Sequence, residues 1–469
     1  MPTLNDVHSR LNATDVAEIV RPANEREVVQ AVERASRSKM PLCPFGGRHS
    51  MGGQQFCPNA IALDTGALLG TPRLDTKRGL LTVGAGTRWP DIIKATRASD
   101  ATGGAAWGIR QKQTGADDLS LGGSLSSNVH GRGLSMGPIV DDVESFRLVT
   151  ASGEAVVCSR TGNPDLFALA IGGYGMFGVI TEVTLKLGPR LRVRRLVDII
   201  DLDDALNAVH RRAAQGCLYG DFQYAIDPGD DTFLRRGVMA CYEPAPPGQD
   251  IDSSEADLSR NSWLELLSLA HTDKRKAFQL YSQHYLATHG RVYWSDTMQL
   301  STYIPTYAEF LAGKRADGDP DESLMITELN VPPERLMDFM RAARLVLRSS
   351  GVEDIYGTIR AIRQDTTTFL PWAREAFACV IFNLRTVHTP AGIAQTQRAA
   401  RGLIDAALDE GGTYYLTYHR WATASQVLRA YPMFPAWLAK KREHDPGEIF
   451  QSAWYHHHRD LLGGSGAGR

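Results

Sequence analysis

The segment Phe45–Gln54, FGGRHSMGGQ, carries the clearest indication of how this chain folds. It follows the short apolar run PLCPF, so a strand is expected to lead into a glycine turn. Gly46 and Gly47 have no Cβ, which lets a phosphate group approach the backbone closely. The exposed N–H groups of such a turn can form an anion-binding nest. Taken alone, the turn and its neighbour His49 fit a solvated surface turn equally well.

A second glycine-rich segment runs from Ser120 to Gly133, SLGGSLSSNVHGRG. Its hydroxyls and glycines suit a cofactor held by hydrogen bonds, because it has neither the Lys of a P-loop nor the context of a Rossmann GxGxxG. Leu121, Leu125 and Val129 recur at every fourth position, which favours packing over a flexible Gly/Ser linker. A third segment, Gly172–Thr181, GGYGMFGVIT, is expected to join a helix to a strand, or to be a simple connector.

Composition limits the class of protein. The chain has 469 residues, 43% hydrophobic and 22% charged, with a net charge of −2. These values predict globular structure in two domains or one large divided domain. The mixed charges give no basis for a nucleic-acid partner or for a membrane surface.

The cysteines and the apolar runs bear on the compartment. The six cysteines form no CxxC pair and no zinc-type spacing, so we expect buried thiols. The N-terminus has no apolar signal region, and no stretch reaches the roughly 20 apolar residues of a membrane span. A reducing, cytoplasmic setting is therefore the expectation.

The remaining pattern predicts an α+β architecture. Asn24–Lys39 has apolar residues at helical spacing, with Asn24 as its cap. The run VESFRLVTASGEAVVCS predicts a hairpin, and FGVITEVTLKLGP predicts a closing strand. After Pro189, strands alternate with amphipathic helices, which predicts a sheet with helices on one face.

In order and spacing, the three glycine-rich segments resemble one family, the vanillyl-alcohol oxidase/para-cresol methylhydroxylase flavoproteins, which includes cytokinin dehydrogenases and alditol oxidases. His49–Gln54 resembles the GHSxxGQ element of cytokinin dehydrogenases, and Arg48–Ser50 resembles the RHS of alditol oxidases. The other similar motifs are Gly122–Ser126 (GGTLS in the family), His130–Gly133 (HGxG), Gly172–Thr181 (GGxGQFGIIT) and Asp445-Pro446 (DP).

The resemblance implies an FAD cofactor, bound covalently through the flavin 8α-methyl group to His49. It implies that the turn around Gly46 holds the diphosphate, that Ser120 and Ser126 bond the cofactor, and that Val179 and Ile180 lie near the adenine. The implied cofactor-binding residues are Gly46, Gly47, Arg48, His49, Ser50, Gln54, Ser120, Gly123, Ser124, Ser126, Ser127, Val179 and Ile180.

The family plan implies a two-part FAD-binding domain of the para-cresol methylhydroxylase type over residues 13–189. An α+β substrate domain with an antiparallel sheet is expected over 190–410, and 411–469 is expected to return to the FAD domain. The chain departs from the family at two points. Trp107–Leu121 contains no Cys, so no second flavin tether is expected. The catalytic Asp of cytokinin dehydrogenases falls at Gly115, and Asp117 and Asp118 are interpreted as a solvated or capping pair.

The candidate catalytic residues are Tyr418, His419 and Arg360. Arg360 lies in a run that resembles the strand carrying a pocket Arg in alditol oxidases, although the Glu two residues upstream is Thr358 here. On a strand, Tyr418 and Arg420 would share one face and His419 the other. An ordinary core role remains the alternative for each. Other candidate pocket residues are Tyr293–Asp296, Gln299, Asn383, Tyr414, Tyr415 and Arg420.

The expected activity is that of an FAD-dependent oxidase. A hydride would pass from a C–OH or C–NH group of a small organic substrate to flavin N5, and O2 would be reduced to hydrogen peroxide. The alternatives are a dehydrogenase with another electron acceptor, a biosynthetic flavoenzyme that cyclises or inserts oxygen, or a binding module. No metal is expected, because the histidines of Tyr455–His458 would point to opposite sides of an extended segment. The substrate and the oligomeric state stay open.

Overall fold

The N-terminal part contains a small parallel sheet. The computed structural model describes residues 1–97, 106–113, 115–251, 258–301, 310, 311, 313 and 318–463. Helix α1 (Glu25–Ser38) begins at Asn24, whose side chain accepts a hydrogen bond from the Glu27 N–H, as the sequence predicts. Strand β4 (Leu42–Phe45) pairs with β5 (Ile61–Asp64), which pairs with β3 (Glu18–Val20), all parallel. A short ladder of β1 (Thr3–Leu4) and β2 (Thr14–Asp15) precedes them.

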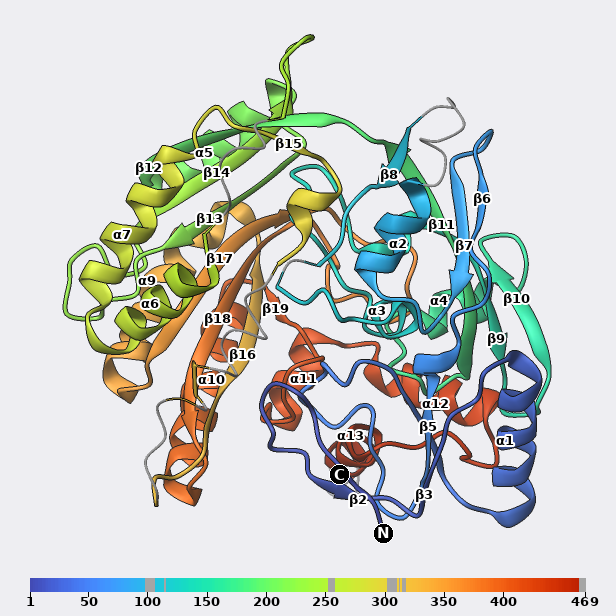
Figure 1. The fold of residues 1–469 in the computed structure, drawn as a ribbon. Helices are drawn as coiled ribbons and strands as arrows, with labels where there is room; N and C mark the ends of the chain where they lie inside the picture. The colour runs from blue at the N-terminus through green and yellow to red at the C-terminus, as the bar shows by residue number, and fades with distance from the viewer. Residues whose placement is uncertain are drawn as a thin grey trace.

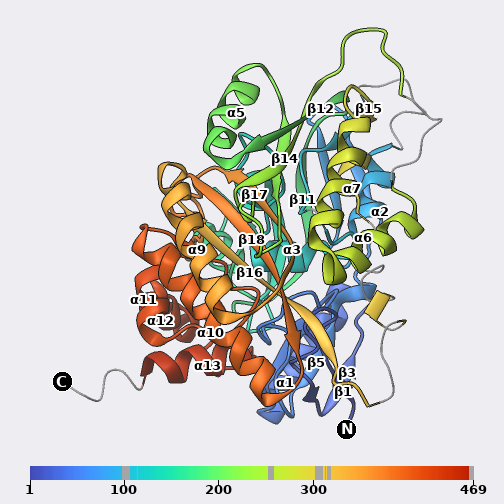
Figure 2. The ribbon, with the colours of Figure 1, turned by 90° about the vertical axis from the view of Figure 1, so that its left-hand side faces the viewer.

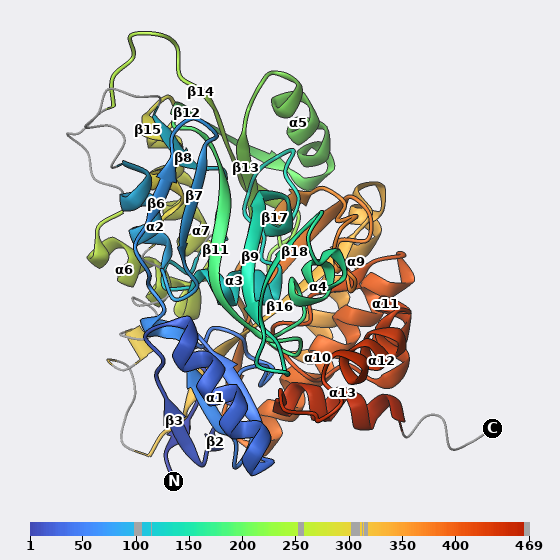
Figure 3. The same ribbon diagram turned by 90° about the vertical axis from the view of Figure 1, so that its right-hand side faces the viewer.

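A six-stranded antiparallel sheet follows (Figure 3). Its order is β10-β9-β11-β7-β6, with β8 paired to β11. The predicted hairpin is formed by β9 and β10, and the predicted closing strand is β11. The bounds are β6 (Arg73–Asp75), β7 (Leu80–Gly84), β8 (Trp107–Ile109), β9 (Val143–Val149), β10 (Ala155–Ser159), β11 (Val179–Pro189), α2 (Trp89–Thr96), α3 (Leu121–Ser127) and α4 (Pro164–Ala170).

An eight-stranded antiparallel sheet forms the other half of the molecule (Figure 1). Its order is β15-β12-β14-β13-β17-β18-β16-β19. The strands are β12 (Arg192–Asp201), β13 (Tyr219–Tyr224), β14 (Arg236–Pro244), β15 (Val292–Trp294), β16 (Glu322–Val331), β17 (Asp354–Ile362), β18 (Phe377–Val387) and β19 (Thr413–Tyr414).

Helices cover both faces of this sheet, so the predicted coverage of one face is wrong. Helices α5 (Leu202–Ala214), α9 (Leu336–Ser350) and α10 (Pro390–Asp409) lie on one side (Figure 2). Helices α6 (Arg260–Thr272) and α7 (Lys274–Ala287) lie on the other side. The sequence analysis did not predict α6 and α7, because their apolar residues do not form a clear stripe along one helix face. Helix α7, for example, buries only Ala277 and Ser282.

The C-terminal segment packs against the N-terminal strands (Figure 1). It forms α11 (Ala424–Ala430), α12 (Phe434–His444) and α13 (Ala453–Gly463). The Leu42 N–H donates to the Ile449 carbonyl at 2.8 Å, and Asp445 accepts the N–H groups of Ile449 and Phe450. The Asp-Pro motif thus shapes the chain where it returns to β4. The histidines 456–458 lie on α13 rather than on an extended segment.

The structure has the predicted α+β class, with an FAD-type half and an antiparallel-sheet half. Strand β11 ends at Pro189 and β12 begins at Arg192, while the domain bounds themselves stay a prediction. All six cysteines are buried and free. Among the described residues, none of the helices combines the length and the apolar character that a membrane crossing requires.

Candidate functional site

The three glycine-rich segments line one cavity. The turn after β4, helix α3 and the approach to β11 all contribute to its wall, although they are far apart in the sequence. Of the residues predicted to bind the cofactor, Ser124 alone lies outside this wall. The residues on the wall are Gly46, Gly47, Arg48, His49, Ser50, Gln54, Ser120, Gly123, Ser126, Ser127, Val179 and Ile180.

The turn after β4 presents unpaired backbone donors to this cavity. Among the described residues, the N–H groups from Gly47 to Ser50 have no hydrogen-bond acceptor. Arg48 has a φ of 58°, so the turn follows a left-handed path that leaves these groups outside any ladder. Donors of this kind fit the oxygens of a diphosphate. The chemistry of this donor set therefore fits a dinucleotide.

Helix α3 explains why the second segment is rich in glycine. Its cap, Ser120, accepts a hydrogen bond from the Gly123 N–H at 3.4 Å. A Cβ at Gly46 would lie 2.1 Å from the Ser120 hydroxyl oxygen, and a Cβ at Gly122 would lie 2.9 Å from Ala85. Ser124 does not line the cavity: its side chain is fully buried, and its hydroxyl has no partner among the described residues. Its role in cofactor binding stays a prediction.

His49 borders this cavity and has a histidine partner that the sequence did not reveal. Its Nδ1 lies 2.8 Å from Nε2 of His8. Burial lowers the pKa of His49 to about 3 and that of His8 to about 4, and the neighbouring His8 further lowers the pKa of His49. Both rings are therefore neutral at pH 7, so His49 retains a nucleophilic nitrogen. No local signal marks His8, because the pair joins positions 41 residues apart.

A second cavity of about 520 Å³ adjoins the first. Both are bordered by His49, Ser50, Leu119 and Ser127. The inner face of the eight-stranded sheet supplies much of its wall, because alternate residues of each strand point the same way. These residues are Asp221 and Gln223 of β13, Tyr356, Thr358 and Arg360 of β17, and Ile381 and Asn383 of β18.

The structure separates the predicted catalytic residues. Arg360 and Tyr418 line the second cavity, as do the predicted Gln299, Asn383 and Tyr415. His419 does not, since its Nε2 lies 3.0 Å from the Thr327 hydroxyl and its ring stacks on Trp421. The segment from Tyr415 is a turn rather than the strand on which the alternation was predicted. The predicted wall residues Tyr293–Asp296, Tyr414 and Arg420 also lie outside the described cavity wall.

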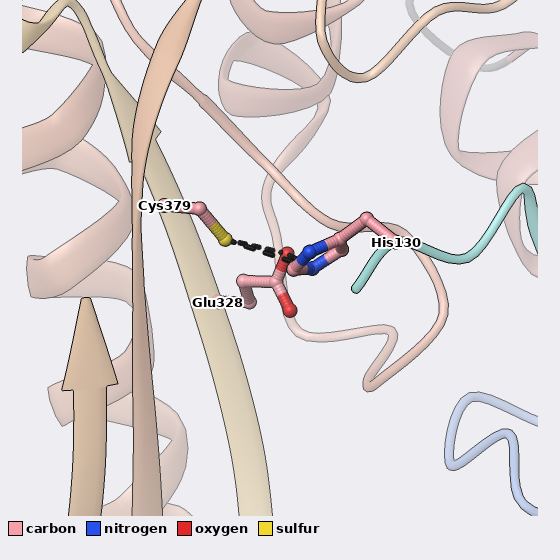
Figure 4. A group of neighbouring side chains, drawn as sticks. All are labelled: His130, Glu328 and Cys379. Carbon is pink, nitrogen blue, oxygen red and sulfur yellow. Dashed lines mark hydrogen bonds and ion pairs between the residues drawn. The ribbon is translucent and has the colours of Figure 1, made fainter. Parts of the chain in front are cut away.

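Tyr418 contacts a fully buried group that the sequence reasoning missed, formed by His130, Glu328 and Cys379. Figure 4 shows these three side chains. The Tyr418 hydroxyl donates to Glu328 at 3.2 Å. Glu328 also lies 2.9 Å from Nε2 of His130 and accepts from the Cys379 thiol at 3.0 Å. Burial alone would raise the pKa of Glu328, but attraction to His130 and the hydrogen bonds from His130 and Cys379 hold it below its usual value. Burial, and then the Glu328 charge, raise the pKa of Tyr418 well above its usual value.

His130, Glu328 and Cys379 are also a possible ligand set, since their donor atoms lie within 4.8 Å of one another. Imidazole, carboxylate and thiolate are the ligands that zinc takes in proteins. Here they already bond one another, so their polar atoms are satisfied without an ion. Glu328 is 198 residues from His130, which explains why no sequence motif indicates this group of residues.

The two aspartates near the missing catalytic position differ. Asp118 is exposed and pairs with Arg88 at 3.2 Å, as a solvated residue would. Asp117 instead lines the second cavity, where it pairs with the buried Lys112 at 2.9 Å and accepts the Ser301 N–H. Of the predicted solvated or capping pair, Asp118 is the solvated residue, whereas Asp117 is held in the cavity wall by Lys112 and by the Ser301 N–H.

Comparison with known proteins adds the following similarities. Residues 16–159 match the family model described as an FAD binding domain. The chain is 29% identical over 192 residues to cytokinin dehydrogenase 7 of Oryza sativa subsp. japonica, which covers 38% of this chain and 34% of that protein. It is 30% identical over 254 residues to an uncharacterized oxidoreductase, ORF5 in the fasciation locus of Rhodococcoides fascians, covering 53% and 55%.

A third relative is the FAD-dependent monooxygenase tpcD of Cochliobolus heterostrophus, 37% identical over 159 residues, covering 32% of this chain and 29% of that protein. The chain thus matches between 29% and 55% of the length of these curated relatives.

Proposed function

Because the chain carries an FAD-binding domain and is consistent with the vanillyl-alcohol oxidase/para-cresol methylhydroxylase flavoproteins, we propose that it is an FAD-dependent oxidoreductase that oxidises a small organic substrate. The observation that carries the proposal is the convergence of the three glycine-rich segments on one cavity. That cavity adjoins a second one, which is lined by polar side chains. A cofactor site that adjoins a separate polar cavity suits a reaction between the two.

The chain's own residues divide into a cofactor set and a substrate set. The donors of Gly47–Ser50 would hold the diphosphate, and the hydroxyls of Ser126 and Ser127 would bond other polar atoms of FAD. When bound, FAD supplies a two-electron oxidant whose N5 takes a hydride from a C–OH or C–NH carbon. Arg360 and Tyr418 would then orient the substrate in the second cavity.

Tyr418 is suited to take the proton that such an oxidation releases. Its hydroxyl donates to Glu328, whose pKa is held below its usual value by attraction to His130 and by hydrogen bonds from His130 and Cys379. The phenolic oxygen can therefore accept a proton from the substrate heteroatom while its own proton passes to Glu328. The raised pKa of Tyr418 opposes a free phenolate, so the two transfers should be coupled.

We propose a covalent tether at His49, supported by its neutral ring, its place on the wall that both cavities share and its motif. Protein precipitated with acid should keep its yellow colour. His49→Ala should release the flavin into the supernatant, while His210→Ala, at an exposed position of α5, should behave as the native chain does. Flavin that stays in the pellet of His49→Ala would exclude this tether.

The activity itself is tested by anaerobic reduction of the flavin with a panel of small alcohols and amines. We propose O2 as the electron acceptor, so aerobic turnover should give hydrogen peroxide in an amount equal to the substrate oxidised. The relatives named cytokinin dehydrogenases favour a second candidate, a dehydrogenase with another acceptor. In that case the flavin would be reduced but air would yield little peroxide. A flavin that no member of the panel reduces would oppose both.

The six free, buried cysteines support a reducing setting, and we include a cytoplasmic location in the proposal.

A further inference from the structure

Three arginines line the second cavity on its strand side. Arg132, Arg195 and Arg360 are buried, with exposed fractions of 8%, 7% and 6%. Arg132 lies beside β13, since the Gly220 N–H donates to its carbonyl. Arg195 belongs to β12 and Arg360 to β17. Guanidinium groups stay protonated in proteins, so this wall carries fixed positive charge.

Arg132 makes contacts that leave its charge unbalanced. Its Nη2 donates to the Met298 carbonyl at 2.7 Å, and its guanidinium lies 4.9 Å from the centre of the Tyr242 ring. Its Nε has no hydrogen-bond partner among the described residues. All these partners are neutral, so a buried donor of Arg132 stays available for a ligand.

Arg195 likewise has only neutral hydrogen-bond partners among the described residues. It donates to the Tyr242 hydroxyl at 2.9 Å and to the Thr288 hydroxyl at 2.9 Å, and it lies 4.4 Å from the centre of the Tyr293 ring. Within the part of the chain that the structure describes, it forms no ion pair with a carboxylate. Its contacts hold the side chain in place without neutralising it.

The two acidic residues of the described wall, Asp117 and Asp221, compensate for these charges only in part. Asp117 is paired with Lys112. Asp221 raises the pKa of Arg132 through space but makes no ion pair with it in the described structure, and its Oδ1 has no partner there. Buried charges are costly unless they are paired. A negatively charged ligand would therefore be stabilised by the positive charge that remains on this wall.

We propose that the substrate carries a carboxylate or phosphate group, and that Arg132 and Arg195 bind this anion while Tyr418 faces the carbon that is oxidised. This assignment of the substrate class rests on the proposed function. The sheet order separates the two ends, because β12 and β13 lie on one side of β17, whereas Glu328, the partner of Tyr418, is on β16 at the other side. A neutral ligand would leave Arg195 without a paired carboxylate and Arg132 with only the through-space charge of Asp221.

The test compares two probes of the same shape, benzoate and benzamide, with inorganic phosphate as a third. Each is titrated into the purified flavin-loaded protein at constant ionic strength, followed by the visible flavin spectrum and by the thermal unfolding midpoint. We expect benzoate or phosphate to bind at least 10-fold more tightly than benzamide, since hydrogen bonds to charged groups are the stronger ones. Whichever of the two anions binds better identifies the kind of anionic group.

Variants assign the anion to the two arginines. Arg132→Met and Arg195→Met should each weaken the better anion about 10- to 100-fold and leave benzamide unchanged. Arg195→Lys keeps the positive charge but loses the planar guanidinium and its paired N–H donors, so it should weaken anion binding less than Arg195→Met does. This variant tests the site even if a Met variant does not fold. Arg211→Met, at an exposed position of α5, is the matched control and should bind as the native chain does.

The proposal would be overturned if neither benzoate nor phosphate binds more tightly than benzamide, or if the arginine variants leave the affinity for the better anion unchanged. These measurements need no turnover. Anion binding without flavin reduction by any substrate would therefore refute the proposed function alone, and reduction by neutral substrates without anion binding would refute the anion site alone.

Discussion

The substitution Glu328→Gln tests the role of the buried Glu328 carboxylate most directly. This change keeps the shape of the side chain but removes the charge that Tyr418, His130 and Cys379 share at 3.2, 2.9 and 3.0 Å. Each hydrogen bond loses charge assistance of about 1 kcal/mol, so the variant should be less stable by about 3 kcal/mol. If the phenolic proton of Tyr418 passes to Glu328, flavin reduction should also slow by about 100-fold or more.

The assay separates these two effects. Urea unfolding measures stability, and single-turnover anaerobic reduction of flavin-loaded protein measures the step itself, at equal flavin content. Cys379→Ala is the matched control, because it removes one hydrogen bond to Glu328 but not the charge, and it should cost about 1 kcal/mol with little change in rate.

The contribution of Glu328 to the stability of the folded chain should change with pH in a defined direction. The pKa of Glu328 is held below its usual 4.5 in the folded chain, so its contribution to stability is present above that pH and disappears as the pH falls through the folded value. The stability difference between native protein and Glu328→Gln should therefore shrink below about pH 4. A Glu328→Gln enzyme that reduces its flavin within about threefold of the native rate, at full flavin content, would refute the proton path through Tyr418.

Three further changes test the fold around the site. Gly46→Ala would place a Cβ 2.1 Å from the hydroxyl that caps α3 and should weaken FAD binding by about 1–3 kcal/mol, whereas Gly463→Ala, which meets no atom within 4 Å, should keep full flavin content. Burial raises the pKa of Asp354 to about 7, so the native chain should lose stability as pH rises from about 4 to 7, and urea unfolding should show a flatter profile for Asp354→Asn. Lys441→Met leaves Asp445 buried at 1% exposure without its partner and should destabilise the chain by about 3–5 kcal/mol in urea, a loss under about 1 kcal/mol contradicting the pairing.

The cofactor side of the site was largely predictable from the sequence. Glycine placement reports local backbone geometry, so the segments at Gly46, Gly123 and Val179 could be recognised one by one and by their order. The exception is Ser124, which a helix places on the same side as Ser127, three residues further on. Its burial therefore depends on what α3 packs against and not on the helical period.

The substrate side was much less predictable. Arg360 and Tyr418 line the cavity, but His419, a candidate for its imidazole, and Arg420, expected to share a strand face with Tyr418, do not. The neighbours of His419, Thr327 and Trp421, instead hold its ring away from the cavity. A turn has no fixed alternation, so the side from which each residue projects depends on what it packs against.

The sequence by itself determined the class of the fold and the glycine turns that suit a dinucleotide, because both follow from local preferences of the backbone and from the spacing of apolar residues. Only the tertiary structure decided that His8 contacts His49, that Glu328 joins His130 and Cys379, and that Arg132 and Arg195 share one cavity wall with Arg360. Those contacts depend on strand order and on the face that each strand turns inward. Both are set by packing between segments that lie far apart along the chain.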